Sequence, residues 1–296
     1  MPEFVQLRPN IDRLCIPFGG TWTGVFLIHG EQNVLIDSGG EAAHADQWIV
    51  PALKEMGMDL SQISYLACTH CHGDHVGSHA RLKALCPGLK IACFEGSRDK
   101  IRDPLHYSKL IRARFPAFSP QAPKGLTGAE SDVLLQDGQC LTPFLRLLHT
   151  PGHDTDSVCW LDERTNTLIA GDSLQLNGTV SQGTALVMDL PGYLQSLKKL
   201  KELPVDCILT GHDFLPLGPE AEGHGAVREY LDACEQYLAD YGAFLESAWQ
   251  AGDHDPASLT QKLIRHMGCV MPEYLFLPLY TVSEILKSKQ LEGVLS

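Results

Sequence analysis

The sequence has no long apolar run and no long basic run. No apolar stretch approaches the ~18 residues that a membrane-spanning helix needs. The longest basic run is Lys198-Lys199 followed by Lys201, and the chain carries a formal net charge of −13 at pH 7. Because nucleic-acid binding requires clustered positive charge to neutralise phosphates, we expect no membrane span and no nucleic-acid partner.

The sequence also lacks the cysteine spacing of a disulfide scaffold. Its ten cysteines are scattered, and Cys68 and Cys71 alone have the CxxC spacing. Cys159 and Cys207 lie inside apolar strand-like runs, where small buried thiols are common. The N-terminal residues show neither the basic nor the apolar region of a signal peptide. We therefore expect a reduced, cytoplasmic setting.

Residues 1–218 alternate short apolar runs with helical patterns, which is typical of an α/β domain. Runs of β-branched and apolar residues predict strands at 25–28, 34–37, 65–69, 91–94, 144–149, 157–161, 167–170 and 205–210. Apolar residues at helical spacing predict helices at 45–56, 80–85 and 193–203. Residues 97–130 are rich in proline and mixed charge, and they predict an irregular insert or lid.

Residues 219–296 have a different pattern. A sustained apolar stripe over 227–248 predicts a long helix, and Asp255-Pro256 is a favourable start for a second. A third helix is expected near 282–289. We interpret 219–296 as a helical C-terminal region that contributes to a substrate pocket or to a homodimer contact. Its tyrosines and leucines are more typical of core than of a binding surface.

Four potential metal ligands lie within six residues, directly after the strand predicted at 65–69. They are His70, His72, Asp74 and His75. Side chains two apart on an extended segment point the same way, so His70 and His72 face together and Cys71 faces the body of the fold. Imidazole and carboxylate suit Zn²⁺ or another borderline divalent ion. Four donors exceed what one site takes from a short loop, and two neighbouring metals are the simpler interpretation.

Three further donors follow predicted strands downstream. His153, Asp172 and His212 each come directly after a glycine at the end of a strand pattern. Loop residues in that position can enter a shared cleft. Each motif is weak alone, but their order after the histidine run makes the combination specific.

The ordered motifs HxHxDH, Pro-Gly-His, Gly-Asp and Gly-His resemble the metallo-β-lactamase superfamily in its dinuclear form. The resemblance covers residues 70–212. It implies an α/β fold, a four-layer αβ/βα sandwich with the site at the edge between two sheets. Together with the tail pattern, this predicts a catalytic domain at 1–218 with a helical appendage at 219–296.

The resemblance also implies two divalent metal ions, most typically Zn²⁺, with iron or manganese as alternatives. One metal is assigned to His70, His72 and His153, the other to Asp74, His75 and His212, and Asp172 bridges them. Asp37 matches a residue that, in this superfamily, holds the metal-binding loops in position without binding a metal itself. Cys71 matches no ligand position.

This resemblance implies a hydrolase in which a metal-bridging hydroxide attacks a small carbonyl substrate, with Asp74 as proton acceptor. A thioester is expected first, then an ester or lactone. The helical tail is most similar to the quinolone-signal thioesterase branch. It also resembles that of small endoribonucleases of the superfamily, so a phosphodiesterase or ribonuclease stays an alternative. A third alternative is a metal-containing regulatory protein with little turnover.

Overall fold

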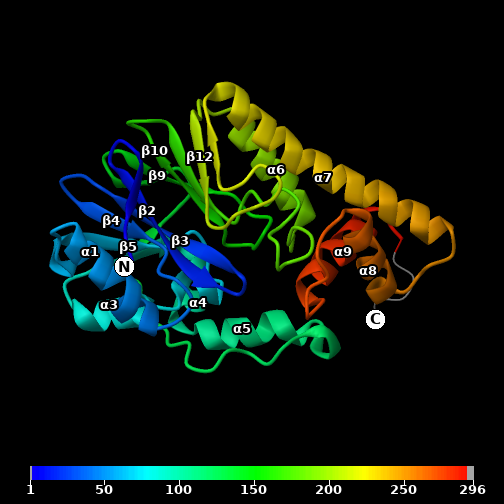
Figure 1. The fold of residues 1–296 in the computed structure, drawn as a ribbon, viewed down its shortest axis with the longest axis horizontal. Coiled ribbons are helices and arrows are strands. Elements are labelled where there is room, and N and C mark those ends of the chain that lie inside the picture. The colour runs from blue at the N-terminus through cyan, green and yellow to red at the C-terminus, as the bar shows by residue number, and fades with distance from the viewer. Residues whose placement is uncertain (1, 292–296) are drawn as a thin grey trace.

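The computed structural model describes residues 2–291, in which two β-sheets pack face to face with helices on both outer sides (Figure 1). This confirms the predicted four-layer αβ/βα sandwich. Helices α1 and α3 cover one sheet, and α6 and α7 cover the other. The helices α8 and α9 lie beyond the sandwich, near the far end of α7.

The first sheet has seven strands in the order β1-β2-β3-β4-β5-β6-β7. Neighbours from β1 to β4 are antiparallel, and those from β4 to β7 are parallel. The strands are β1 (Val5–Arg8), β2 (Ile11–Phe18), β3 (Thr21–Ile28), β4 (Asn33–Ile36), β5 (Ile63–Ala67), β6 (Lys90–Phe94) and β7 (Val133–Leu135).

The second sheet has six strands in the order β13-β12-β11-β10-β9-β8. Only β11 and β12 pair in parallel; the other neighbours are antiparallel. The strands are β8 (Cys140–Thr142), β9 (Leu145–His149), β10 (Val158–Asp162), β11 (Thr167–Gly171), β12 (Cys207–Thr210) and β13 (Glu220–Glu222).

The α-helices are α1 (Val50–Glu55), α2 (Gly73–Val76), α3 (His79–Leu85), α4 (Arg98–Arg102), α5 (Pro104–Ala113), α6 (Leu190–Lys201), α7 (His224–Gln250), α8 (Pro256–His266) and α9 (Phe276–Ser288). The helix predicted at 45–56 forms a π-helical turn over Ala45–Ile49 that continues into α1. Pro51 lies at the start of α1, where its missing N–H costs nothing.

Strand alternation builds the layers. In β3, Phe26 and Ile28 belong to the core between the two sheets, whereas Val25 and Leu27 belong to the core under the first helical layer. Successive side chains of a strand point to opposite faces, so a strand buried on both sides is apolar throughout. Trp160 fills the space between the sheets, and its indole N–H donates to the Cys68 carbonyl at 3.0 Å.

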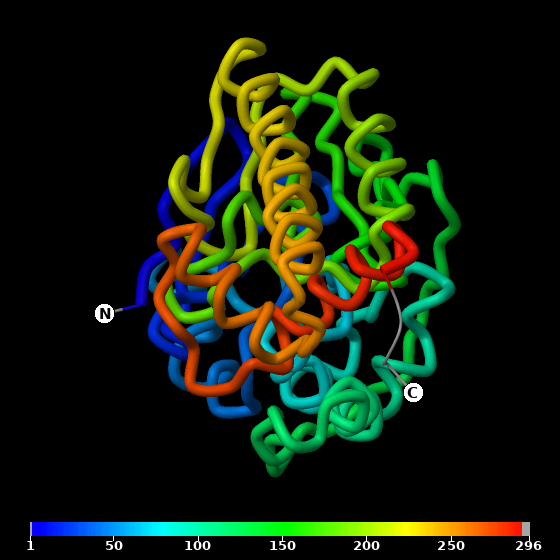
Figure 2. Tube along the Cα trace, turned by 90° about the vertical axis from the view of Figure 1, so that its right-hand side faces the viewer, coloured from blue at the N-terminus to red at the C-terminus, as the bar shows by residue number. Residues whose placement is uncertain are grey.

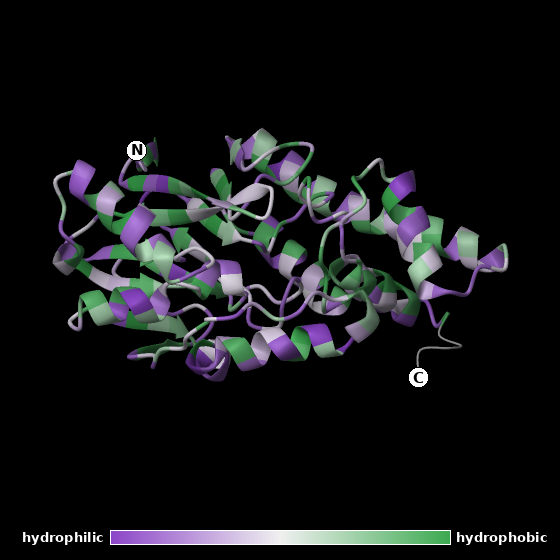
Figure 3. Ribbon diagram, turned by 60° about the horizontal axis from the view of Figure 1, so that its bottom comes forward, coloured by the Kyte–Doolittle hydropathy of each residue, from purple (hydrophilic) through white to green (hydrophobic). Residues whose placement is uncertain are grey.

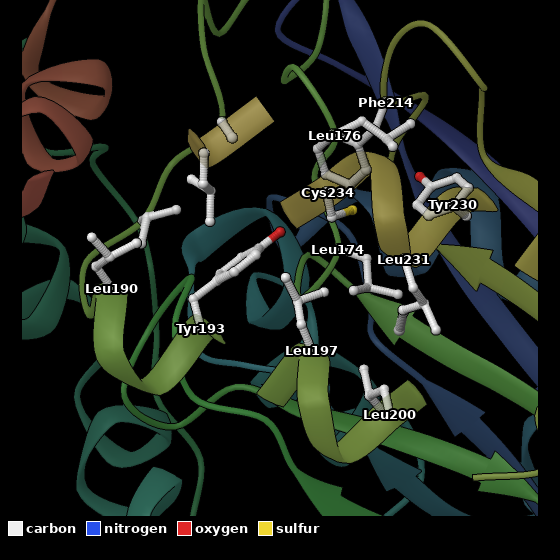
Figure 4. Close-up of a cluster of buried hydrophobic side chains, with 14 of the residues drawn as sticks. Leu174, Leu176, Leu190, Tyr193, Leu197, Leu200, Phe214, Tyr230, Leu231 and Cys234 are labelled. Atoms are coloured by element: carbon white, nitrogen blue, oxygen red, sulfur yellow. The ribbon is translucent and has the colours of Figure 1, made fainter. Parts of the chain in front are cut away.

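The second helical layer rests on a core shared by α6 and α7. Tyr193, Leu197 and Leu200 of α6 face Leu231 and Cys234 of α7 (Figure 4). The aromatic stripe of α7 takes part in this core, since Tyr230 and Tyr241 are fully buried. The preference for core over binding surface is therefore confirmed for these two tyrosines.

The C-terminal region is helical except for one strand. Strand β13 pairs with β12 at the edge of the second sheet, just after the boundary predicted at 218. Below α7, helices α8 and α9 pack together (Figure 2). Leu259 and Leu263 of α8 and Val282 and Ile285 of α9 extend the core formed by α6 and α7. The proposed domain division at 218 stays a prediction.

The prediction that residues 97–130 are irregular is wrong for its first half. Helices α4 and α5 occupy most of 98–113, and polar and apolar residues alternate along α5 (Figure 3). Pro104 begins α5 instead of breaking it, because the Asp103 side chain caps the helix by accepting from the His106 N–H at 2.9 Å. Residues 119–130 contain neither helix nor strand.

Five strands were not predicted: β1, β2, β7, β8 and β13. Four of them have only three or four residues, and β2 carries Pro17 near its end. Short strands have too few residues to show a periodic pattern, so their formation depends on the strands with which they pair. Within residues 2–291, no helix is long and apolar enough to cross a membrane.

Candidate metal centre

The seven predicted donors converge at one end of the sandwich, where strands of both sheets stop. His70 and His72 follow β5 of the first sheet, and Asp74 and His75 lie in the short helix α2. From the second sheet, His153 follows β9, Asp172 follows β11 and His212 follows β12. The cluster therefore depends on the packing of the two sheets and on no single segment.

Three imidazoles form the first group. Nε2 of His153 lies 3.2 Å from Nε2 of His70 and 3.0 Å from Nδ1 of His72. All three nitrogens lie within 4.8 Å of one another. Such a set of converging nitrogen lone pairs matches the coordination preferences of Zn²⁺.

The second group combines imidazole and carboxylate. Nε2 of His212 lies 3.3 Å from Nε2 of His75 and 3.2 Å from Oδ2 of Asp74. Asp172 lies between the groups, because its carboxylate is 3.4 Å from His212 Nε2 and 3.7 Å from His153 Nε2. Its Oδ1 is buried and has no hydrogen-bond donor among the described residues.

The outward nitrogens of four of these histidines are held by oxygen acceptors. Nδ1 of His75 donates to Asp37 at 2.8 Å, and Nδ1 of His212 donates to the Trp22 carbonyl at 2.6 Å. Nδ1 of His70 is 3.1 Å from Thr69 Oγ1, and Nδ1 of His153 is 3.1 Å from the Leu186 carbonyl. An acceptor on the outer nitrogen fixes the tautomer that leaves the inner lone pair free for a metal.

Asp37 ties this arrangement to the first sheet. Its carboxylate accepts the backbone N–H of Thr69 at 2.7 Å and the Thr69 hydroxyl at 2.8 Å, besides the imidazole of His75. The residue is fully buried and adopts a left-handed conformation with φ of 65°. Asp37 therefore fixes both the start of the histidine run and one of its members, as the sequence analysis expected.

Charge balance in the cluster favours cations. Burial by itself lowers the pKa of His75, but the carboxylates of Asp172, Asp37 and Asp74 outweigh burial and raise it to about 9. In the first group, burial and the neighbouring His72 lower the pKa of His153 to about 4. The carboxylates thus attract positive charge to the second group, while the first group offers neutral nitrogens. Divalent cations would replace the protons that the carboxylates attract.

A buried ionic network behind His72 was not predicted. Nε2 of His72 lies 3.3 Å from the carboxylate of Asp154, and Lys100 Nζ is 2.8 Å from Asp154 and 2.6 Å from Asp156. The Tyr107 hydroxyl also donates to Asp154. Asp154 directly follows His153 and could have been noted in the sequence, but no local spacing links it to Lys100 or Tyr107.

Gln175 is a second contact that was not predicted. Its Nε2 lies 3.4 Å from Asp172 Oδ2, and its Oε1 accepts the Leu186 N–H at 2.6 Å. This second bond orients the amide, so Nε2 is the donor toward the cluster. Nε2 also lies 2.8 Å from His153 Nδ1, so an amide donor and the Leu186 carbonyl both contact this nitrogen.

Cys71 belongs to neither ligand group. The residue is buried in the core under the first helical layer, and its thiol donates to the Ser97 carbonyl at 3.6 Å. Burial raises the pKa of this thiol well above its usual range, which disfavours the thiolate that binds metals. The expectation that Cys71 is not a ligand agrees with this geometry.

A cavity of about 260 Å³ lies beside the cluster. Its lining includes His72, Asp74, His153, Asp172 and His212 of the cluster, Tyr107, Ile111 and Arg112 of α5, and Phe276 and Leu277 of α9. Helices α5 and α9 thus supply the wall opposite the cluster. The basic residues Lys262 and Arg265 of α8 do not line it. Within the C-terminal region, pocket residues come from the start of α9 and not from the stripe of α7.

Comparison with known proteins agrees with this architecture. Over 97% of its length, the chain superposes on 96% of a metallo-beta-lactamase family protein from Thermus thermophilus, with a TM-score of 0.73 and 22% identity. It is 29% identical over 242 residues to the lactamase-like protein aptB of Emericella nidulans, which is 78% of this chain and 62% of that protein.

A second relative from Emericella nidulans is named atrochrysone carboxyl ACP thioesterase. It is 26% identical over 201 residues, which is 68% of this chain and 54% of the relative. The chain therefore spans less than two thirds of the length of either relative. The family model of the metallo-beta-lactamase superfamily matches residues 18–212, and the chain belongs to this superfamily.

Proposed function

We propose that this protein is a dinuclear metal-dependent hydrolase of a small carbonyl substrate, with a thioester as the first candidate and an ester or lactone next. The observation that carries the proposal is the convergence of seven donor side chains beside a partly apolar cavity. The relative named as an acyl-carrier thioesterase favours the thioester.

His70, His72 and His153 would hold one cation, and Asp74, His75 and His212 the other, with Asp172 between them. The unpartnered Oδ1 of Asp172 and the oriented imidazoles fit this assignment. The nitrogen-rich donor set suits Zn²⁺ best. Bound cations would supply an activated water and polarise the substrate carbonyl.

Asp74 would receive a proton during hydrolysis. Its side chain is 18% exposed and lines the cavity, whereas that of His75 is fully buried. Burial by itself raises the pKa of Asp74, but the imidazoles of His75 and His212 hold it well below its usual range. The carboxylate is therefore ionised at neutral pH and can accept a hydrogen bond from water in the cavity.

The remaining cavity residues shape what can bind. Ile111, Leu186 and Phe276 form an apolar wall that excludes water from one side of the cluster. The Tyr280 hydroxyl donates to the Ile111 carbonyl at 2.7 Å, so α9 holds α5 in this position. An acyl chain fits such a wall better than a sugar or a polyphosphate does.

The test combines metal analysis with hydrolysis assays over thioester, ester, lactone and phosphodiester panels. We expect two divalent cations per chain and turnover of a carbonyl substrate. Replacing His70 by alanine should abolish turnover and one equivalent of metal, whereas His106→Ala on the exposed face of α5 should change neither. Retention of both metals and of full turnover by His70→Ala would contradict the assignment of His70 as a metal ligand.

The alternatives give different results. A ribonuclease would cleave the phosphodiester panel and bind RNA in a strongly salt-dependent way. A regulatory protein would hold both cations and hydrolyse no member of any panel. Either result would replace the carbonyl hydrolase as the function of this site.

A further inference from the structure

Arg112 is the only lysine or arginine among the residues that line the cavity. It lies on α5, on the wall that faces the cluster of histidines and carboxylates. Within residues 2–291 it forms no ion pair with any acidic side chain, although the chain has 36 acidic residues. Burying a cation without an anionic partner costs free energy, so we expect an anion from outside the chain to pair with Arg112.

The hydrogen bonds of Arg112 leave one edge of its guanidinium unused. Nη1 donates to the Ser108 carbonyl at 3.0 Å and to the Ser108 hydroxyl at 2.6 Å. Nε is buried and has no partner. Nε and Nη2 together form the edge that binds a carboxylate or phosphate in a bidentate manner.

The guanidinium is also held in place. Its carbon lies 5.2 Å from the centre of the Phe276 ring, which belongs to α9 and lines the same cavity. The Ser108 bonds fix it from the other side. Burial lowers the pKa of Arg112, and the carboxylate of Asp74 offsets part of this effect. An arginine held by two neighbours loses little freedom when an anion binds.

We propose that Arg112 is an anion-binding subsite, and that the substrate carries a carboxylate or phosphate oxyanion at a distance from the carbonyl that is attacked. The part of this inference that concerns a carbonyl substrate rests on the proposed function. Anion binding at Arg112 does not depend on it. The substrate would place its oxyanion against the Arg112 guanidinium and its apolar part along Ile111, Leu186 and Phe276.

The oxyanion can belong to the acyl part or to the leaving group, and two substrate pairs separate these sources. Glutaryl and pentanoyl thioesters of N-acetylcysteamine have equal length and differ in the terminal carboxylate. Pentanoyl thioesters of 4′-phosphopantetheine and of pantetheine differ only in the phosphate of the thiol. We expect KM to be about 10- to 100-fold lower for the anionic member of one pair.

The variants are Arg112→Met, Arg112→Lys and the control Arg102→Met. Arg102 lies on α4 in an exposed pair with Asp99, so its loss changes the net charge equally without touching the cavity. Arg112→Met should bring KM for the anionic substrate to within about twofold of KM for its neutral match, whereas Arg102→Met should keep the wild-type ratio. Arg112→Lys should keep part of the preference, because lysine retains the positive charge but lacks the paired N–H donors of the guanidinium.

Calorimetric titration of the metal-loaded protein with glutarate and with inorganic phosphate tests the subsite without turnover. We expect Arg112→Met to weaken binding of at least one of these anions about tenfold relative to Arg102→Met. If no thioester is hydrolysed but this difference is found, the proposed function fails and the subsite stands. Equal anion affinities in the two variants, or an unchanged substrate preference in Arg112→Met, would overturn the subsite.

Discussion

Oδ2 of Asp37 lies 2.8 Å from Nδ1 of His75 and 2.8 Å from the Thr69 hydroxyl, so one carboxylate oxygen orients both ends of the histidine run. Asp37 and Thr69 follow the neighbouring strands β4 and β5, which pair in parallel. The carboxyl ends of parallel strands lie at the same edge of the sheet, so this pairing places Asp37 next to the histidine run. The geometry of the second ligand group therefore depends on a residue that would touch no cation.

Asp37→Asn tests this dependence. Asparagine tolerates the left-handed backbone at this position and keeps one oxygen for the Thr69 N–H, but its amide cannot accept from both other donors. We expect cation affinity to fall by about 10- to 100-fold, measured by competition with a chelator.

The matched control for that measurement is Asp12→Asn. Asp12 lies 2.5 Å from the ring of His29 in a partly buried Asp–His pair that does not line the cavity. Its replacement should leave cation affinity unchanged. Equal losses in both variants would show that the effect is general destabilisation and not orientation of His75.

Gly211→Ala should disturb the cluster without removing any donor. A Cβ atom at this position would lie 2.7 Å from Oδ1 of Asp172 and 2.9 Å from Cε1 of His75. Both side chains would have to shift, so we expect the chelator assay to report weaker binding of the second cation. Gly88→Ala, where a Cβ meets no atom within 4 Å, should bind both cations as the wild type does.

Stability should fall in acid partly because of His79. This histidine is fully buried, with Nδ1 2.8 Å from the Ser38 hydroxyl, and burial lowers its pKa to about 3. The unfolded chain takes up a proton near pH 6.5, whereas the folded chain does so near 3, so stability is lost as pH falls through this window. The contribution is at most about 1.4 kcal/mol per pH unit.

Denaturant unfolding of the wild type and His79→Gln at several pH values checks this sign. The free energy of unfolding of His79→Gln should fall less steeply between pH 6.5 and pH 4 than that of the wild type. Parallel curves for the two proteins would contradict the assignment of this pH dependence to His79.

Lys100→Met should be strongly destabilising. Lys100 Nζ compensates the carboxylates of Asp154 and Asp156, whose side chains are 1% and 2% exposed. Removing one partner of a buried ionic network costs about 3–5 kcal/mol, because the remaining charges stay buried and unpaired. Thermal or denaturant unfolding measures the loss, and Lys109→Met on the exposed side of α5 is the control. A loss below about 1 kcal/mol would mean that the network is not coupled as the structure indicates.

The local sequence was sufficient to predict the donors and the elements that carry them. His70, His72, Asp74 and His75 lie together because they are adjacent in the chain, and glycine before Asp172 and His212 marks two further strand ends. Strands buried on both faces, such as β10 and β11, are apolar except at one end and are recognisable without a partner.

Only the tertiary structure decided which residues contact the predicted metal ligands and which residues form the other wall of the cavity. Asp154 meets Lys100 of α4 and Tyr107 of α5. Arg112 faces the cavity because Tyr280 and Phe276 of α9 hold α5 there. These contacts join segments up to 169 residues apart. Sequence periodicity reports which face of an element is buried, but it does not report which distant element buries it.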